Sequence, residues 1–503
     1  MTLCSSASVD RFDLTRWMVY APWVQEIRLD HRTRPGRLSL NIHHTLRTIK
    51  DRDSTPLLPA LKRLGYSLHA TGGMFISINA AYNLLDHISL LTHISAGLLE
   101  ELDFQADLVN TQFGDFFVED IIRSSLEETI RINPRIRYIR MGYSLSDPCI
   151  PRLPTLWAEF TSLAHLRNLN LTVQYSPANL IAAAIISTKL ASVSIDFVAT
   201  NGGFQVHAYT LLELEEQIND RVSLPLQRLE ICDRSGDFSF APWLDHLSGR
   251  GHLMEFDMSM EGESPIANSS DLDYISAWRG LARRIVAIGS KLKTINLRCS
   301  YYSFDMSPVP TEFLTTLVPA LPNLLNLQSR TSIYDVDSES VVLAALSQPT
   351  LDNFLVNLLA AEKSKNNPLQ KLYLYDSASF SLKALENVAL HAPALQTLYL
   401  SGMDMSLEYR SFPSSPLLAK SPGYSSLKKL SLPWPRELQA FPAAKIRQIA
   451  LLIDTLFPEL ETCDLGIQAD QNPDAATFRL LVKDFRTFRQ HAESIEASSQ
   501  TSL

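Results

Sequence analysis

Glycine is scarce in this sequence, at 18 of 503 residues, about half of the ~7% share typical of soluble proteins. Loops that cradle phosphate groups rely on glycine, and neither GxxxxGKS/T nor GxGxxG occurs in the chain. The five cysteines are widely spaced and form no CxxC pair, so neither a zinc site nor a thioredoxin-like redox motif is indicated. HExxH and GxSxG are also missing. We therefore expect no metal, no cofactor and no enzymatic activity; an enzyme without a recognisable motif is the remote alternative.

Basic residues are outnumbered, since Lys and Arg total 45 against 54 Asp and Glu, which gives a net charge of -9. Binding to a phosphate backbone needs a concentrated basic surface, so nucleic acid is not an expected partner. No apolar run reaches the ~18 residues of a membrane-spanning helix. Residues 1–10 lack the basic and apolar regions of a secretory signal. We expect a cytoplasmic or nuclear protein that does not bind membranes.

One short pattern recurs through the chain: an apolar residue, two variable residues, an apolar residue, one variable residue and a third apolar residue. The fourteen matches lie about 34 residues apart on average, which is the signature of a repeat protein. Residues 351–356 also match but fall too close to the next unit, so we interpret them as part of a helix. The fourteen units begin at residues 24, 61, 99, 136, 166, 190, 226, 253, 292, 324, 369, 395, 427 and 460.

The fourth and sixth positions of the unit alternate around the fifth, as side chains do in a β-strand, so both are expected to face the core. Apolar residues at helical spacing predict helices over 115–130, 311–321, 340–346, 382–390 and 446–457. Strands that alternate with helices at this period run parallel. Such units resemble leucine-rich repeats. We predict an α/β leucine-rich-repeat solenoid, with a curved parallel sheet on its concave face, helices on its convex face and irregular repeats of about 24–45 residues.

The predicted organisation has four parts. Residues 1–22 form a lead-in helix, residues 23–467 form the solenoid of about 14 repeats, and residues 468–490 form a capping helix that shields the last repeat. Asp474 is expected to cap the start of that helix. Residues 491–503 are polar, and we expect them to be disordered.

The concave face is the predicted surface for a protein partner, since solenoids present one continuous strand face to extended partners. Tyr373 and Tyr399 hold the fifth position in successive repeats, so their rings are expected about 4.8 Å apart. Tyrosine is enriched in protein-binding hot spots, although a cross-strand aromatic pair can also serve only to stabilise a sheet. A second, arginine-rich group has a solvated charged rim as its alternative. The predicted partner-binding residues are Tyr373, Tyr375, Tyr399, Lys371, Lys428 and Lys429, and then Arg137, Tyr138, Arg140 and Arg167.

The segment 10–29 (DRFDLTRWMVYAPWVQEIRL) resembles the segment that follows the F-box in a large fungal family of F-box/leucine-rich-repeat-like proteins. Units such as 395–400 and 427–432 are also typical of that family. In the family the F-box binds the small adaptor of a cullin–RING ubiquitin ligase, and the repeats present a substrate. The resemblance therefore implies the substrate-binding part of a receptor for an SCF-type ubiquitin ligase.

The F-box itself is not expected in this chain, because residues 1–22 are too few to form that three-helix module. The chain is expected either to be a fragment whose F-box lies upstream or to act as a receptor half without its docking module. A leucine-rich-repeat interaction scaffold with no role in ubiquitination is the alternative.

Overall fold

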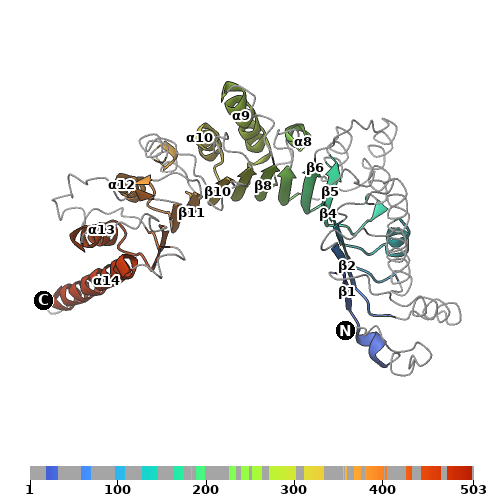
Figure 1. Ribbon diagram of the computed structural model, residues 1–503, viewed down its shortest axis with the longest axis horizontal. Coiled ribbons are helices and arrows are strands. Elements are labelled where there is room, and N and C mark those ends of the chain that lie inside the picture. The colour runs from blue at the N-terminus through green and yellow to red at the C-terminus, as the bar shows by residue number, and fades with distance from the viewer. Residues whose placement is uncertain are drawn as a thin grey trace. The chain divides into compact units, whose positions relative to one another are not determined.

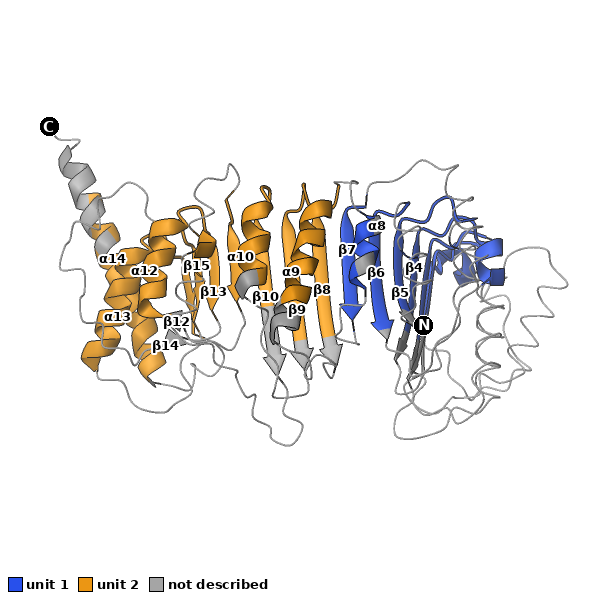
Figure 2. Cartoon of the chain, turned by 90° about the horizontal axis from the view of Figure 1, so that it is seen from above, with its two compact units in different colours: residues 1–234, 239–250 blue, residues 235–238, 251–503 orange. Residues whose placement is uncertain are grey.

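The computed structural model of the chain divides into two compact units (Figures 1 and 2). Unit 1 comprises residues 1–234 and 239–250, and unit 2 comprises residues 235–238 and 251–503. The structure describes residues 19–31, 58–69, 97–107, 127–144, 160, 162–174, 183, 189–198, 226–233, 240–247, 252–262, 271–301, 311–333, 355, 357–359, 368–374, 380–400, 403–404, 426–432, 443–465 and 473–500.

Seven strands of unit 1 lie side by side in the order of the chain, and each described pair is parallel. A 3-10 turn, η2 (Ala21–Trp23), leads into the first strand, and a short helix, α8 (Ala241–His246), follows the last. The strands are β1 (Glu26–His31), β2 (Arg63–His69), β3 (Glu101–Asp107), β4 (Tyr138–Ser144), β5 (Asn168–Gln174), β6 (Ser192–Val198) and β7 (Arg228–Asp233).

Unit 2 also contains parallel strands, and five helices are described in it. Its parallel strands, again in chain order, are β8 (Glu255–Gly262), β9 (Thr294–Tyr301), β10 (Asn326–Ile333), β11 (Lys371–Leu374), β13 (Thr397–Leu400), β15 (Lys429–Ser431) and β16 (Thr462–Asp464). Its helices are α9 (Asp271–Ile288), α10 (Thr311–Ala320), α12 (Leu382–His391), α13 (Ala443–Leu456) and α14 (Pro473–Gln500). A separate two-stranded pair joins β12 (Phe380–Ser381) to β14 (Met403–Asp404).

The second residue of the repeated unit connects each repeat to the next. The carbonyl oxygen of Gln25 accepts hydrogen bonds from the N–H groups of both Lys62 and Arg63, at 2.9 and 3.0 Å. In unit 2 the carbonyl of Gln396 accepts from Lys428 and Lys429 in the same way, at 2.9 and 3.0 Å. Because one acceptor holds the two residues that open the next strand, neighbouring strands start at equivalent positions and the register is preserved.

The core is built from the fourth and sixth residues of the unit, as the pattern predicts. Ile139 and Met141 of β4 are both 0% exposed, and the equivalent leucines of β11 and β13 are buried as well. Ser329, the polar sixth residue of the β10 repeat, is buried in the same row. All fourteen predicted units coincide with strands, so the prediction of an α/β leucine-rich-repeat solenoid is confirmed.

Large aromatic residues fill the space between helices and strands. Helices α9 and α10 lie side by side on one face of the β8–β10 strands (Figures 1 and 2). Trp278 of α9 meets Phe313 of α10 edge to face, with ring centroids 4.8 Å apart, and both rings are fully buried. In unit 1, Phe197 of β6 meets Trp243 of α8 at 5.8 Å. Such pairs add about 0.5–1.5 kcal/mol beyond their buried area.

The predicted helices agree with the described ones where the two can be compared. The segments 311–321, 382–390 and 446–457 correspond to α10, α12 and α13. Of the segment 115–130, only 127–130 is described; it belongs to a helical stretch that ends at Ile132. The segment 340–346 lies outside the described residues, as do residues 1–18 of the expected lead-in helix.

The end of the chain differs from expectation. Residues 491–500, expected to be disordered, continue α14, which begins at Pro473 and ends at Gln500. Asp474 lies inside the first turn of α14 and not at the expected cap position. Its carboxylate there interacts favourably with the positive end of the helix dipole. The sequence after Pro473 contains neither glycine nor a further proline, so nothing interrupts the backbone hydrogen bonds. Residues 501–503 lie outside the described part.

Among the helices in the described part of the chain, none combines the length and the apolar character needed to cross a membrane.

Candidate functional site

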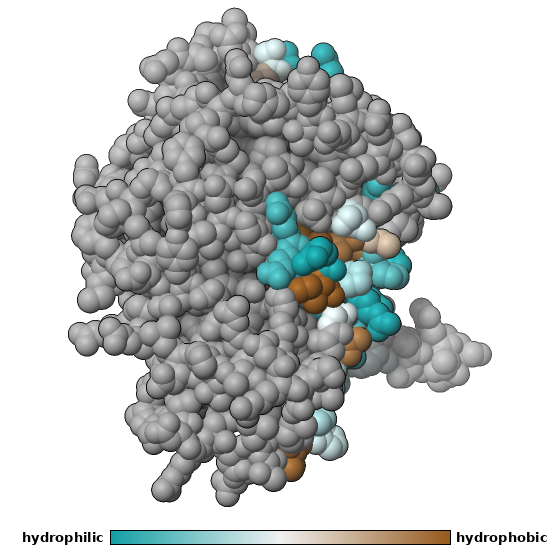
Figure 3. Space-filling model, turned by 90° about the vertical axis from the view of Figure 1, so that its right-hand side faces the viewer, coloured by the Kyte–Doolittle hydropathy of each residue, from teal (hydrophilic) through white to brown (hydrophobic). Residues whose placement is uncertain are grey.

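The third and fifth residues of each six-residue repeat pattern lie on the sheet face opposite the core. We call this surface the open face. Where described, their side chains are exposed or half-buried in both units. Most are polar or charged, and neighbouring strands bring equivalent positions into direct register. Hydrophilic and hydrophobic residues lie side by side on the described part of the molecule seen in Figure 3. Mixed polarity of this kind is typical of surfaces that bind protein partners reversibly.

The predicted tyrosine pair occupies the open face of unit 2. Tyr373 of β11 and Tyr399 of β13 are direct register partners, and both side chains are half-buried. The next residue in the same row is Ser431 of β15, whose hydroxyl is buried and forms no hydrogen bond with any described group.

Lysines border the tyrosine pair. Lys371 precedes Tyr373 by two residues on β11, and Lys429 lies two strands away in the same third-position row. Both are exposed, as is Lys428, whose Nζ lies 3.8 Å from a carboxylate oxygen of Glu461. The structure therefore brings together five of the six predicted residues of this group. The sixth, Tyr375, lies outside the described residues.

The second predicted group lies in unit 1, on β4 and β5. Arg137 and Arg167 hold the second position of successive repeats, and the N–H of Arg167 donates to the carbonyl of Arg137 at 3.0 Å. Tyr138 and Arg140 follow on the open face, in register with Asn168 and Asn170 of β5. The three arginines are exposed, and Tyr138 is half-buried. All four predicted residues therefore lie together.

Electrostatics around Tyr138 favour its neutral form. Burial raises the pKa of the Tyr138 phenol above its ordinary value, and Arg140 opposes that effect. The carboxylates of Asp103, Glu101 and Glu230 each raise the pKa further. The phenol is consequently a hydrogen-bond donor at neutral pH.

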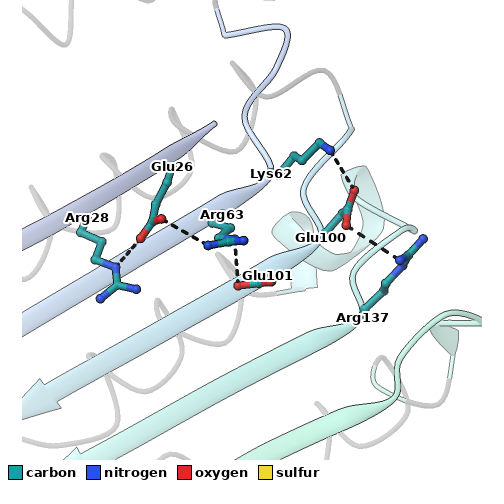
Figure 4. A network of polar contacts seen from close by, with 7 residues as sticks. All are labelled: Glu26, Arg28, Lys62, Arg63, Glu100, Glu101 and Arg137. Carbon is teal, nitrogen blue, oxygen red and sulfur yellow. Dashed lines mark hydrogen bonds and ion pairs between the residues drawn. The ribbon is translucent and has the colours of Figure 1, made fainter. Parts of the chain in front are cut away.

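Two ladders of alternating charge run across the first strands of unit 1, and sequence reasoning missed them (Figure 4). In the row of second residues, Glu100 lies 3.8 Å from Lys62 and 4.0 Å from Arg137. In the row of third residues, Arg63 lies 3.5 Å from Glu26 and 3.3 Å from Glu101. The available signal was the alternation of charge sign at identical positions of successive repeats.

Arg28 extends the row of third residues. It lies on β1, at the fifth position of the first repeat pattern. Its Nε donates to Glu26 at 2.5 Å, and its stem lies over Gly65 on the neighbouring strand, where a Cβ would be 3.0 Å from Cγ of Arg28. Each of these ion pairs is partly exposed to water, so each contributes no more than about 1 kcal/mol.

The thiol of Cys463 is held in its protonated form. Cys463 is half-buried in β16, and desolvation raises the pKa of its thiol to about 12, with a further contribution from Asp464. A thiol that stays protonated is a poor nucleophile. Within the described ranges, no three side chains of His, Cys, Asp or Glu are grouped as metal ligands. The described open face thus offers hydrogen bonding, charge and aromatic surface, which are the means of binding.

Comparison with known proteins identifies no family for this chain. No family model matches the chain, and no curated protein matches it. Among solved structures, the crystal structure of a TLR13–ssRNA13 complex is similar with a TM-score of 0.35 and 15% sequence identity. The match covers 82% of this chain and 55% of that chain, so this chain spans little more than half the length of the protein it matches.

Proposed function

We propose that this protein is a recognition module that binds a protein partner through the open face of unit 2, with Tyr373 and Tyr399 at the centre of the contact. The observation that carries the proposal is their direct register on β11 and β13, on the open face and bordered by the exposed Lys371 and Lys429. Two rigid aromatic side chains with few rotatable bonds lose little entropy when a partner covers them.

The surroundings of the tyrosine pair support a binding role over a purely structural one. The core on the other side of these strands is already complete, because Leu372, Leu374, Leu398 and Leu400 are buried there. The tyrosines therefore contribute to packing only on the open face. Lysines at the border of an aromatic centre are typical of an interface with a polar rim.

A finer version of the proposal concerns the cellular role. Segment 10–29 resembles the segment that follows the F-box in F-box/leucine-rich-repeat-like proteins, which supports a substrate-binding part of a receptor for an SCF-type ubiquitin ligase. In that role the tyrosine pair would hold the substrate, and an F-box would bind the cullin–RING adaptor. An interaction scaffold without ubiquitination would use the same surface.

The test is quantitative affinity purification from the native cell, followed by mass spectrometry. The bait is the tagged chain, compared with a Tyr373→Ala/Tyr399→Ala variant. Tyr20→Ala serves as the matched control, because Tyr20 is an exposed tyrosine that precedes β1 and lies off the open face. We expect at least one protein to be captured by the parent chain and by the control, and to fall about tenfold or more with the double variant.

Two results would decide against the proposal or its finer version. An unchanged set of captured proteins, with a double variant that melts like the parent chain, would make the tyrosine pair a structural feature only. A partner that depends on the tyrosines, captured without cullin or adaptor, would support the scaffold and remove the ligase role from this chain.

A further inference from the structure

Neither of the two charge ladders of unit 1 continues beyond β4. The second positions alternate in sign from Lys62 through Glu100 to Arg137, the third positions alternate from Glu26 through Arg63 to Glu101, and ion pairs join the neighbours in each row. At β5 the alternation fails, because Arg167 follows Arg137 in the row of second residues. The row of third residues changes there as well, from charged side chains to Tyr138 and Asn168. Positive charge therefore accumulates on β4 and β5 without an opposing row.

The arginines of this region have little compensation from described residues. Arg137 has one carboxylate partner, Glu100, at 4.0 Å, and Glu100 is shared with Lys62. Among the described residues, no ion pair joins Arg140 or Arg167 to a carboxylate. Asp103 is the register partner of Arg140 on β3, and its Oδ1 accepts a hydrogen bond from Gln105 at 3.1 Å, so it is the acidic neighbour of Arg140 although no ion pair joins the two.

Short polar side chains continue the surface beyond the arginines. Asn168 and Asn170 of β5 are in register with Ser192 and Ser194 of β6, and all four are half-buried. We call these four short side chains the low strip. Tyr138 and Arg140 lie on one side of it, and Arg228 and Glu230 of β7 lie on the other. Amides and hydroxyls in such a strip can hydrogen-bond to a chain that lies across the strands.

We propose that Arg137, Arg140 and Arg167, with Tyr138 and the low strip beside them, bind an acidic, extended segment of a protein partner. The inference extends the proposed function to unit 1 and rests on the open face being a recognition surface. Charge complementarity selects the occupant: the protein as a whole carries a net charge of -9, yet β4 and β5 and the residues that open them contain three arginines and no carboxylate, the nearest acidic residues lying on neighbouring strands.

The spacing suits carboxylates on an extended chain. Same-side residues of an extended segment lie about 6.6–6.8 Å apart, which arginines on strands about 4.8 Å apart can span with their long side chains. Guanidinium groups can hold carboxylates through two parallel hydrogen bonds. The phenol of Tyr138, on the same strand as Arg140, adds a hydrogen-bond donor to the three guanidinium groups.

The experiment measures binding of a labelled peptide of six Glu-Ser repeats to the full chain by fluorescence anisotropy, at low and high salt. The variant is Arg140→Glu/Arg167→Glu, and Arg140→Gln/Arg167→Gln provides a milder change should the reversal impair folding. Arg279→Glu/Arg283→Glu is the matched control, since it makes the same charge change on exposed positions of α9. Peptides of six Lys-Ser and six Gln-Ser repeats, and a single-stranded oligouridylate, are the competing probes.

We expect the Glu-Ser peptide to bind the parent chain, to lose about tenfold or more in affinity with the reversed variant, and to change less than about twofold with the control. Higher salt should weaken the binding. No binding to the parent chain, or an equal loss in the control, would overturn the inference. An oligouridylate that binds more tightly and depends on the same arginines would also overturn it, by making the site a nucleic-acid site.

These outcomes are separable from the fate of the proposed function. Failure of the peptide, with partner capture that still depends on Tyr373 and Tyr399, removes only the inference about unit 1. Loss of that dependence in the affinity purification removes the proposed function itself.

Discussion

The side-chain oxygen of Asn133 accepts a hydrogen bond from the backbone N–H of Leu99, in the preceding repeat, at 3.3 Å. The amide nitrogen of Asn133 donates to the carbonyl of Thr129 at 3.0 Å, and the side chain is fully buried. One amide thus fastens the end of a helical turn to the adjoining repeat. Its removal leaves the N–H of Leu99 without this partner, whereas the carbonyl of Thr129 still accepts from the backbone N–H of residue 133, at 3.1 Å.

We expect Asn133→Ala to lower the free energy of unfolding by about 1–3 kcal/mol, because the buried N–H of Leu99 loses the side-chain oxygen that accepts from it. Asn323→Ala is the matched control. Its amide also donates to a carbonyl of another repeat, Ser290, at 2.9 Å, but at the protein surface, where water can replace it. Urea denaturation of the two variants measures the difference; equal losses would show that burial of Asn133 is not what makes its bonds important.

We expect substitution by alanine to have different effects on stability at two glycines. Gly97 has a φ of 70°, and a Cβ there would lie 3.0 Å from the carbonyl oxygen of Ile132. Gly97→Ala is expected to cost about 1–2 kcal/mol, since an L-residue is strained in that conformation. Gly65→Ala would press only on the stem of Arg28, whose side chain is 75% exposed and can move. We expect it to change stability by less than about 1 kcal/mol in either direction. Thermal unfolding of both variants tests the contrast.

The phenol of Tyr138 should titrate at a higher pH than an ordinary tyrosine. Its raised pKa means that the folded protein holds the proton more tightly than the unfolded chain. The stability linked to this group is therefore complete below the unfolded pKa and is lost as pH rises through the folded pKa. Arg140→Gln should raise the pKa further, because the arginine lowers it. Ultraviolet titration of phenolate, with Tyr138→Phe as the reference, measures both; a decrease in the Arg140→Gln variant would contradict the prediction.

Cys463 is expected to resist alkylation in the folded protein. With a thiol pKa of about 12, it carries almost no thiolate near pH 8, and burial also limits access. Iodoacetamide labelling followed by peptide mass spectrometry should find Cys463 unmodified until urea unfolds the chain. Cys232 on β7, which is half-buried as Cys463 is, provides the internal comparison at a similar degree of burial. Rapid labelling of Cys463 under native conditions would show that the thiol is accessible and reactive.

The strands could be predicted from the sequence because their signal is repeated and local. The period of two within each unit fixes which side chains face the core, and the fourteen copies leave no ambiguity about parallel order. The same logic placed Tyr373 opposite Tyr399, and the structure confirms that register. It also placed Arg137, Tyr138, Arg140 and Arg167 together, which the described strands confirm.

Features without such a repeated signal were missed. The pair of β12 and β14 has only two residues in each strand, too few for any period to show. Helix α9, with 18 residues, was not predicted, although its buried Trp278, Leu281, Ala282 and Ile285 follow helical spacing. The polar composition of residues 491–500 suggested disorder, whereas helix propagation from a packed segment needs only the absence of breakers.

The ion pairs of the open face depend on rotamers, which a sequence does not specify. Their equivalent positions in neighbouring repeats predict that Glu26 and Arg63 are adjacent. Whether Arg63 also pairs with Glu101 depends on the conformation of its side chain. The overlap of Arg28 with Gly65 is of the same kind. It depends on which way a long side chain turns.

Strand order follows chain order within each unit, and this has a mechanical consequence. A force that separates the two ends of a unit acts on one strand pair at a time, because no pairing in the described sheet of a unit joins its first strand to its last. Repeats would then peel away singly, each releasing a short length of chain at modest force. Under tension, each compact unit would lengthen in small steps as single repeats unfold, and it would shorten again as the repeats refold when the load is removed.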